Sequence, residues 1–323
     1  MKPTFRWLVA AALAALGSYA SAQEAWPSRP VTVVVPYAPG GVTDAIARTI
    51  AQPLSQALGQ QVLVENKAGG NGLIGTDFVA NAKPDGYTLV MMIDTNTIAP
   101  SLYPKLNHDP LKSFTPITML AKASQIIVAH PSFAPNTLQD LIATARTAST
   151  PIFYASPGNG TSHHLGMERL KLMTHAKLQH VPYKGGGQAV TDLLAGHVPV
   201  GIIGIAPALP HVKAGKLKAL AVTGQKRSPV LPDVPTAQES GLAGFESFNW
   251  FGLLAPAGTP QPIINRLHAE VVKVMRSPEL AERFATMPVE VTTSERPADF
   301  GKFMAADVAK WPPIVKAANV KAD

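Results

Sequence analysis

Strand signals and helix signals alternate along the chain, and this alternation constrains the fold more strongly than any other feature. The β-branched run at residues 31–35, bounded by prolines, predicts a strand buried on both faces. Residues 43–58 carry apolar side chains at helical spacing and predict a helix, which Pro53 is expected to kink. Further elements are expected as a strand at 61–65, a helix at 75–82 and a strand at 87–93. This order is typical of a parallel sheet with right-handed crossovers.

The same alternation resumes in the second half of the chain. The expected strands are 126–129, 152–155, 178–181, 198–203 and 217–222, and the helices between them are 137–148, 163–174, 187–196 and 207–214. The last third is mostly helical, at 261–276, 278–286 and 297–318. Because these last helices need a sheet to cover, we expect them to return to the first domain.

The chain therefore predicts two α/β domains, with the second inserted into the first. A length of 323 residues is also large for one core. The first domain is expected to comprise residues 23–124 and 245–323, and the second residues 125–244. The crossings would fall near 123–125 and 244–249, and the short linkers there predict hinge motion between the domains.

The first 22 residues have the pattern of an export signal. Lys2 and Arg6 give a positive start, and the ten residues from Leu8 to Gly17 are apolar, too few to span a bilayer. Small residues then lead to an expected cleavage after Ala22. An anchoring or core helix is the alternative. The pattern predicts an exported, periplasmic protein.

Composition excludes several classes of function. The chain has no cysteine, so disulfides, thiolate nucleophiles and cysteine-based metal sites are excluded. Without residues 1–22 the formal charge falls from +7 to +5, and this excess is spread rather than clustered. The aromatic share of 7% is low for stacking on single strands. We therefore expect no nucleic-acid partner.

The turn after the first strand has the properties of an anion site. In open α/β sheets, ligands bind beyond the carboxyl ends of the strands. Here Gly40 and Gly41 precede a helix whose first N–H groups have no intrahelical partner and carry partial positive charge. We expect Asp44 to cap the helix while the N–H groups from Gly40 to Thr43 face the ligand. A turn with a purely structural role is the alternative.

The second half offers a matching loop. Residues 156–164 follow a predicted strand and combine glycines with Ser156, Asn159 and Thr161, which can donate hydrogen bonds. A third glycine-rich loop, residues 182–187, follows the next strand. Two domains that face each other with such loops would form a cleft suited to an anion, because charge-assisted hydrogen bonds are worth about 1.5–3 kcal/mol each.

The sequence also offers patterns for a dinucleotide site, a zinc site and a hydrolase site. Residues 70–75 fit the dinucleotide pattern G-x-G-x-x-G, with Asp94 as a ribose-binding acid, but the loop before them is long for the required tight turn. His163, His164 and Glu168, with two further histidines, could suggest zinc, although adjacent histidines diverge on a helix. Ser156 beside those histidines could suggest a hydrolase, although no G-x-S-x-G motif is present.

These loops also carry a resemblance to a known family, the Bug-type extracytoplasmic solute receptors of tripartite tricarboxylate transporters. The matching segments are 36–44, 64–75, 84–89, 154–165, 180–186, 214–217, 231–236 and 250–260. They cover nearly the whole chain after residue 22, in order. The resemblance implies a two-domain α/β periplasmic binding fold of the second type, with mixed, mostly parallel sheets and a ligand cleft between the domains.

The resemblance also implies how such a receptor works. One ligand carboxylate would be held by the first loop and by residues 156–161, largely through backbone groups and bridging waters. Family ligands include di- and tricarboxylates, acidic amino acids and aromatic acids. No cofactor, metal or catalytic residue is implied. Two departures from the family pattern are Pro157, which can stiffen its loop, and the apolar stretch 204–206, where a polar contact is more usual.

The resulting hypothesis is a monomeric periplasmic receptor that captures a small organic acid and delivers it to membrane transporter subunits. The alternatives are a ligand sensor for a signalling kinase and a serine-type hydrolase. Tyr37 and Tyr183 could wall the pocket, and Lys184 could neutralise a second carboxylate. The candidate ligand-binding residues are Tyr37, Ala38, Gly40, Gly41, Val42, Thr43, Asp44, Thr95, Ser156, Gly158, Asn159, Gly160, Thr161, His164, Tyr183, Lys184 and Gly204.

Overall fold

The computed structural model describes residues 26–321, so the expected export signal, residues 1–22, lies outside the described residues. The strands are β1 (Val31–Val35), β2 (Val62–Asn66), β3 (Thr88–Ile93), β4 (Phe114–Ala129), β5 (Ile152–Ser156), β6 (Leu178–Pro182), β7 (Val200–Gly204), β8 (Lys218–Val222), β9 (Phe248–Pro256) and β10 (Glu290–Val291). The helices are α2 (Val42–Leu58), α3 (Leu73–Ala80), α4 (Asp94–Leu102), α5 (Leu138–Thr147), α6 (Ser162–Thr174), α7 (Gly186–Leu194), α8 (Ile205–Lys213), α9 (Gln261–Met275), α10 (Pro278–Ala285) and α11 (Pro297–Ala317), with a 3-10 turn η1 at Gly70–Gly72.

The first lobe is a sheet in the order β2-β1-β3-β9-β4 with helices on both faces. In β1, Val33 faces a core shared with α2, α9 and α10, whereas its neighbour Val34 faces a second core shared with α3 and α11. This alternation explains why β1 is apolar throughout, because a strand covered on both faces has no side that faces water. The helix α2 continues through Pro53 as one element.

The second lobe repeats this layered arrangement around β7, β5 and β6. Its strands pack on one face against α5 and α6 and on the other against α7 and α8. β5 pairs in parallel with both β6 and β7. The elements expected from the sequence in this half are all present, with ends shifted by a few residues except at the start of β4.

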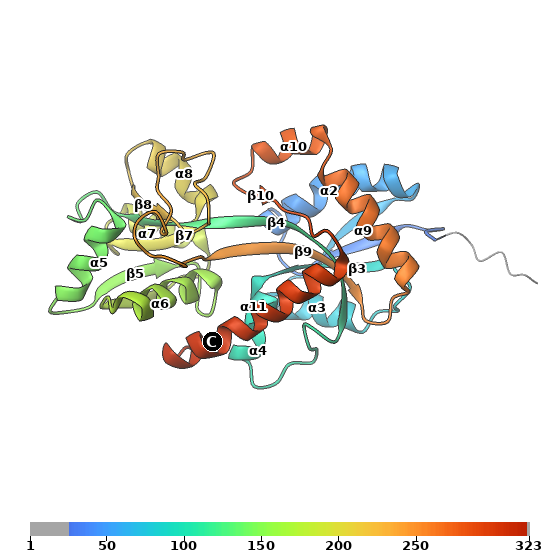
Figure 1. Cartoon of the computed structure of the whole chain (residues 1–323), viewed down its shortest axis with the longest axis horizontal. Helices are drawn as coiled ribbons and strands as arrows, with labels where there is room; N and C mark the ends of the chain where they lie inside the picture. Colours follow the sequence, from blue (N-terminus) through green and yellow to red (C-terminus); the bar gives the residue numbers. More distant parts are fainter. Residues whose placement is uncertain (1–25, 322–323) are drawn as a thin grey trace, which may run out of the picture.

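Two long strands join the lobes. Figure 1 shows β4 and β9 running side by side from one lobe into the other. They pair antiparallel, and the last pair of this ladder joins Ser124 to Phe248, whereas the next residue, Gln125, already pairs with Gly204 of β7. The chain therefore passes from one lobe to the other inside a continuous strand.

These crossing strands correct part of the sequence-based expectation. The α/β class and the mixed sheets are confirmed. Among the named strands of the described chain, however, every antiparallel pair involves β4 or β9, and the parallel pairs are β1 with β2 and β3, and β5 with β6 and β7. Parallel pairing therefore does not dominate. The strand β9 and the helix α4 were not expected, and β4 begins twelve residues earlier than the predicted 126.

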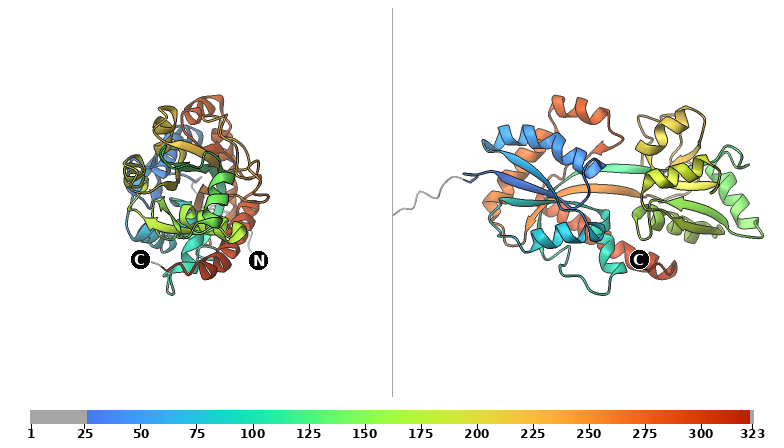
Figure 2. Two further views of the ribbon diagram at one scale, coloured as in Figure 1. Left: turned by 90° about the vertical axis from the view of Figure 1, so that its left-hand side faces the viewer. Right: turned by 180° about the vertical axis from the view of Figure 1, so that it is seen from behind.

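The last helix, α11, packs against both lobes. Its first half buries Phe300 and Met304 in the first lobe. Its second half buries Trp311 beside Leu165 of α6, and the far end of the helix lies along the second lobe in Figure 2. The expectation that the final helices return to the first domain is thus incomplete, because α11 also contacts the second lobe. Among residues 26–321, no helix combines the length and apolar character needed to cross a bilayer.

The close contact between β9 and α11 makes a testable prediction. A Cβ atom at Gly252 would lie 2.2 Å from Phe300 Cζ, so Gly252→Ala must displace a buried ring and should lower the free energy of unfolding by about 1–3 kcal/mol. The matched control is Gly301→Ala in α11, where the nearest atom to the new Cβ is Pro116 Cγ at 3.5 Å. This change should be neutral or stabilising by up to about 1 kcal/mol. Urea unfolding of both variants tests the prediction; equal losses would contradict it.

Candidate functional site

A cavity of about 270 Å³ lies between the lobes, where several helices begin. Its floor is formed by β4 and β9, and four helices present their first residues to it: α2 through Val42, α6 through His163, α7 through Gly186 and α8 through Ile205. The full lining is Val42, Ala123, Ser124, Pro157, His163, Gly186, Gly204, Ile205, Ala206, Pro207, Asn249, Phe251, Pro288 and Val289.

Three of these four helices begin without a side-chain cap. The residues before α2, α7 and α8 are Gly41, Gly185 and Gly204, and none has a side chain that could satisfy the first N–H groups. Only α6 is capped, by Thr161, whose hydroxyl accepts a hydrogen bond from the N–H of His164. Uncapped helix starts carry partial positive charge, and their N–H groups favour a bound anion. The cavity is therefore suited to a negatively charged group.

The first loop uses Asp44 differently from the expectation. The Asp44 carboxylate accepts the N–H of Gly40 at 3.0 Å, Arg48 Nε at 3.0 Å and the amide of Asn66 at 2.9 Å. Arg48 holds the pKa of Asp44 down at about 2, so the carboxylate is ionised. The expected free N–H of Gly40 is thus already bound. This is a correction, and of residues 40–43 Val42 is the one that lines the interlobe cavity.

Tyr37 and Thr95 bind each other. The Tyr37 hydroxyl lies 2.6 Å from Thr95 Oγ1, and burial raises the pKa of Tyr37 above its usual value. A Cβ atom at Gly72 would lie 2.6 Å from the same hydroxyl, so the glycine allows this close packing. Ala38 is exposed on the loop above. Tyr37 and Thr95 lie behind the first loop and outside the lining of the interlobe cavity.

In the second loop, the polar side chains hold the loop itself. Ser156 is fully buried, and its hydroxyl lies 2.6 Å from His180 Nε2. Thr161 donates to the carbonyl of Gly158 at 2.9 Å, and the Asn159 amide donates to the carbonyl of Lys321 at 2.6 Å. Gly160 has φ +68°, a conformation that favours glycine. The side chains that the sequence offered as ligand donors therefore order the loop, and the N–H groups of Gly158 and Gly160 are also bound within it, by Ser156 Oγ at 3.2 Å and His164 Nδ1 at 3.1 Å.

His164 lies behind this loop in a buried cluster. Its ring stacks on His180 with centroids 3.6 Å apart, and its Nδ1 accepts the N–H of Gly160 at 3.1 Å. Burial, His180 and Lys171 lower the pKa of His164 to about 3, so the ring is neutral. His164 and Asn159 line a different cavity of about 640 Å³, on the side of the second lobe next to residues 318–321. The structure therefore does not bring them into the interlobe cavity.

The third loop contributes less than the sequence suggested. The Tyr183 hydroxyl donates to Asp192 at 2.7 Å, and burial raises the pKa of Tyr183 to about 12. Lys184 is exposed and lies outside the cavity lining. Gly204, by contrast, lies in the wall as expected. Of the seventeen candidate residues, Val42 and Gly204 are the two that line the interlobe cavity.

A hydrogen-bond network beneath the cavity connects the two lobes. The amide of Asn249 on β9 donates to Asp94 Oδ1 at 3.0 Å and to Ser162 Oγ at 3.0 Å. Gln125 donates to the same Ser162 hydroxyl at 2.9 Å and accepts from Ser247 at 2.9 Å. Burial raises the pKa of Asp94 to about 6. Asp94, the first residue of α4, thus forms a contact between the lobes and is not a ribose-binding acid.

The alternative sites find no support in the geometry. Within residues 26–321, no group of three or more histidines and acidic residues could hold a metal ion. At Gly75 a Cβ atom would lie 2.7 Å from the carbonyl of Lys67, so this glycine of the dinucleotide pattern serves close packing. Ser156 contacts His180 and not His163 or His164, and its burial prevents attack on a substrate.

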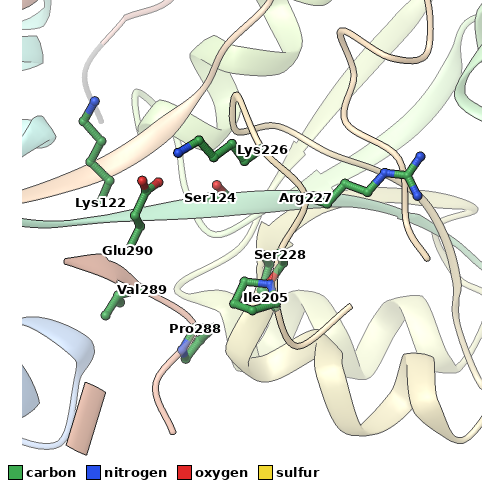
Figure 3. Close-up of a pocket in the computed structure, with 10 residues that line it drawn as sticks. Lys122, Ser124, Ile205, Lys226, Arg227, Ser228, Pro288, Val289 and Glu290 are labelled. Atoms are coloured by element: carbon green, nitrogen blue, oxygen red, sulfur yellow. The ribbon is translucent and has the colours of Figure 1, made fainter. Parts of the chain in front are cut away.

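A second cavity of about 240 Å³ adjoins the first and shares Ser124, Ile205, Pro288 and Val289 with it. It carries the charged groups that the inner cavity lacks: Lys122, Lys226, Arg227 and Glu290. Figure 3 shows Lys122 and Glu290 projecting in the same direction, with Lys226 on the neighbouring loop. Arg227 is paired with Glu239 at 2.9 Å. Mixed charges therefore surround the outer cavity.

Sequence reasoning missed the floor and one edge of the inner cavity. Asn249 and Phe251 belong to β9, which was not expected as a strand, and Pro288 and Val289 precede the two-residue strand β10. From the sequence, His163 was considered as a metal ligand and as the base of a hydrolase, not as part of the wall of a carboxylate site. The one signal available was position: Asn249 and Ser124 fall where the chain was expected to cross between domains.

Comparisons with known proteins agree with this architecture. The sequence pattern of the family described as "Tripartite tricarboxylate transporter family receptor" matches residues 46–320. The protein BugT of Bordetella pertussis is 35% identical over 303 residues, which cover 92% of each chain. The structure of the periplasmic binding protein BugD has a TM-score of 0.77 at 37% identity and covers 92% of this chain and 100% of its own. A protein of R. palustris solved with adipate has a TM-score of 0.79 at 33% identity and covers 92% and 99%. The expected periplasmic binding fold is thereby confirmed.

The buried histidine of the second loop predicts a dependence of stability on pH. The pKa of His164 is about 3 in the folded chain and about 6.5 when unfolded, so the unfolded chain takes up a proton first as the pH falls. The contribution of this residue is complete above pH 6.5 and is lost toward pH 3. Between pH 7 and pH 5, the free energy of unfolding should therefore fall by about 2 kcal/mol more in the wild type than in His164→Gln.

Urea unfolding at both pH values measures this difference. His197→Gln, at a histidine whose side chain is 69% exposed, is the surface control. A His164→Gln variant with the same pH dependence as the wild type would contradict the assignment of a neutral, buried His164.

Proposed function

The chain belongs to the tripartite tricarboxylate transporter family receptors, and on this premise we propose that it captures a small carboxylate between its two lobes and delivers it to a membrane transporter. The observation that carries the proposal is the cavity bounded by the starts of α2, α6, α7 and α8, three of them without a side-chain cap. The R. palustris neighbour solved with adipate supports the chemical class.

The ligand in this proposal is held by backbone groups. The N–H groups of Gly41, Val42 and Thr43 bind the carboxylate from the first lobe, and the loop of residues 156–161 closes on it from the second through bridging water. Charge-assisted hydrogen bonds of about 1.5–3 kcal/mol each offset the cost of removing a carboxylate from water. The side chains of Asp44, Ser156 and the other ordering residues act by fixing these loops.

Capture requires the lobes to move relative to each other. We place the domain boundaries at 23–124 with 245–323, and at 125–244. The exchange of partners along β4 supports this division, since Ser124 pairs with β9 and Gln125 with β7. Carboxylate binding favours the closed arrangement to the extent that it gains contacts from both lobes.

The remaining parts of the proposal follow from this role. The protein acts as a monomer in the periplasm after cleavage near Ala22, and it performs no catalysis. Uptake of the bound acid in a strain that lacks the gene separates transport from sensing, because a receptor that serves only a signalling kinase would leave uptake unchanged.

Val42 gives a variant that separates ligand binding from folding. Val42→Asp places a carboxylate at the first residue of α2, where the helix dipole stabilises it by about 0.3–1 kcal/mol, yet it repels an anion in the cavity. Affinity for carboxylates should fall about tenfold or more while the free energy of unfolding stays equal or rises. Val42→Asn, similar in size and neutral, is the matched control.

Isothermal titration calorimetry with a panel of carboxylates measures both variants. Binding of no carboxylate by the wild type, together with hydrolysis of a test ester, would overturn the proposed function. Equal affinities of the Asp and Asn variants would show that the anion does not bind at the start of α2.

A further inference from the structure

His163 is a buried polar side chain in the wall of the interlobe cavity. It lies in the first turn of α6 and exposes 9% of its surface. Neither ring nitrogen has a hydrogen-bond partner among residues 26–321. Its neighbour His164, by contrast, is bound within the second loop. A buried hydrogen-bonding group without a partner costs about 1–3 kcal/mol, so each such group calls for an explanation.

No other side chain of the cavity wall would stabilise a protonated, positively charged His163 ring. The lining contains Ser124 and Asn249 and no lysine, arginine, aspartate or glutamate within the described chain. The Asn249 amide is already used by Asp94 and Ser162. Burial lowers the pKa of His163 to about 4, so the imidazole is neutral near pH 7.

A neutral imidazole offers a ligand one hydrogen-bond donor and one hydrogen-bond acceptor. One ring nitrogen carries a proton and donates, and the other has a lone pair and accepts. A carboxylate oxygen can accept from the first nitrogen but cannot donate to the second. A ligand that carries only carboxylates and carbon therefore leaves one buried nitrogen unsatisfied, whereas a hydroxyl on the same ligand can donate to it.

We propose that His163 is a ligand-binding residue that selects carboxylates bearing a hydroxyl group. This inference rests on the proposed function and deepens it, because it names the ligand class of the same site. Helix starts hold the carboxylate, and His163 recognises the neutral donor next to it.

Matched pairs of acids test the inference. Affinities for lactate and propionate, malate and succinate, and 4-hydroxybenzoate and benzoate are measured by calorimetry at pH 7 for the wild type and three variants. His163→Phe removes both ring nitrogens, His163→Gln keeps one donor and one acceptor, and His197→Phe is a surface control. In at least one pair, the wild type should bind the hydroxylated acid about five- to 150-fold more tightly, since an unsatisfied buried polar group costs about 1–3 kcal/mol.

The variants show whether His163 causes the preference. In His163→Phe, the ratio of the two affinities should fall to near one, while His163→Gln should retain most of it and His197→Phe all of it. Equal binding of both members of every bound pair by the wild type overturns the inference but leaves the proposed function intact. A preference for the hydroxylated acid that persists in His163→Phe likewise overturns the inference and leaves the proposed function intact. Binding of none of the six acids by the wild type also overturns the inference, whereas the proposed function is tested separately by the wider carboxylate panel.

Discussion

The antiparallel ladder of β4 and β9 is the constraint on which the rest of this structure depends. β4 pairs with strands of both lobes, whereas β9 pairs with it as far as Ser124. Residues of both strands line the cavity at which four helices start. Beneath the cavity, Asn249 ties Asp94 at the start of α4 to Ser162 at the start of α6. Because Asp94 is buried, its charge depends on these donors. Asn249 thus both connects the lobes and lines the interlobe cavity.

In this architecture, polar side chains order the loops, and the backbone N–H groups at the helix starts are left to bind an anion. Several polar side chains form hydrogen bonds that order the loops and so fix the backbone that precedes α2 and α6. They are Asp44, Ser156, Thr161 and His164. Glycines before three of the helices leave their N–H groups unused by side chains. An anion would therefore be held by rigid backbone dipoles and not by a flexible cationic side chain, which reduces the entropy lost on binding.

The sequence predicted those parts of the molecule that depend on local signals. Hydrophobic periodicity located most strands and helices, and glycine-rich turns after 31–35 and 152–155 correctly indicated loops that precede helices. It could not predict β9, because 248–256 reads as an ordinary apolar segment until its partners in β3 and β4 are known. For the same reason Asn249 and Phe251 were missed in the cavity. Polar residues such as Asn159 and Tyr37 were identified by type, but their partners, Lys321 and Thr95, are distant in sequence, and nothing local reveals that they are engaged.

The central claim is that backbone amides from both lobes converge on one anion, and amide NMR tests it most directly. Titration of the ¹⁵N-labelled chain with a carboxylate that binds should shift the amide resonances of Gly41, Val42 and Thr43 together with those from Gly158 to Ser162, with one common dissociation constant. Shifts confined to the second lobe around Lys171 and Asn319, where the separate 640 Å³ cavity lies, would contradict the account.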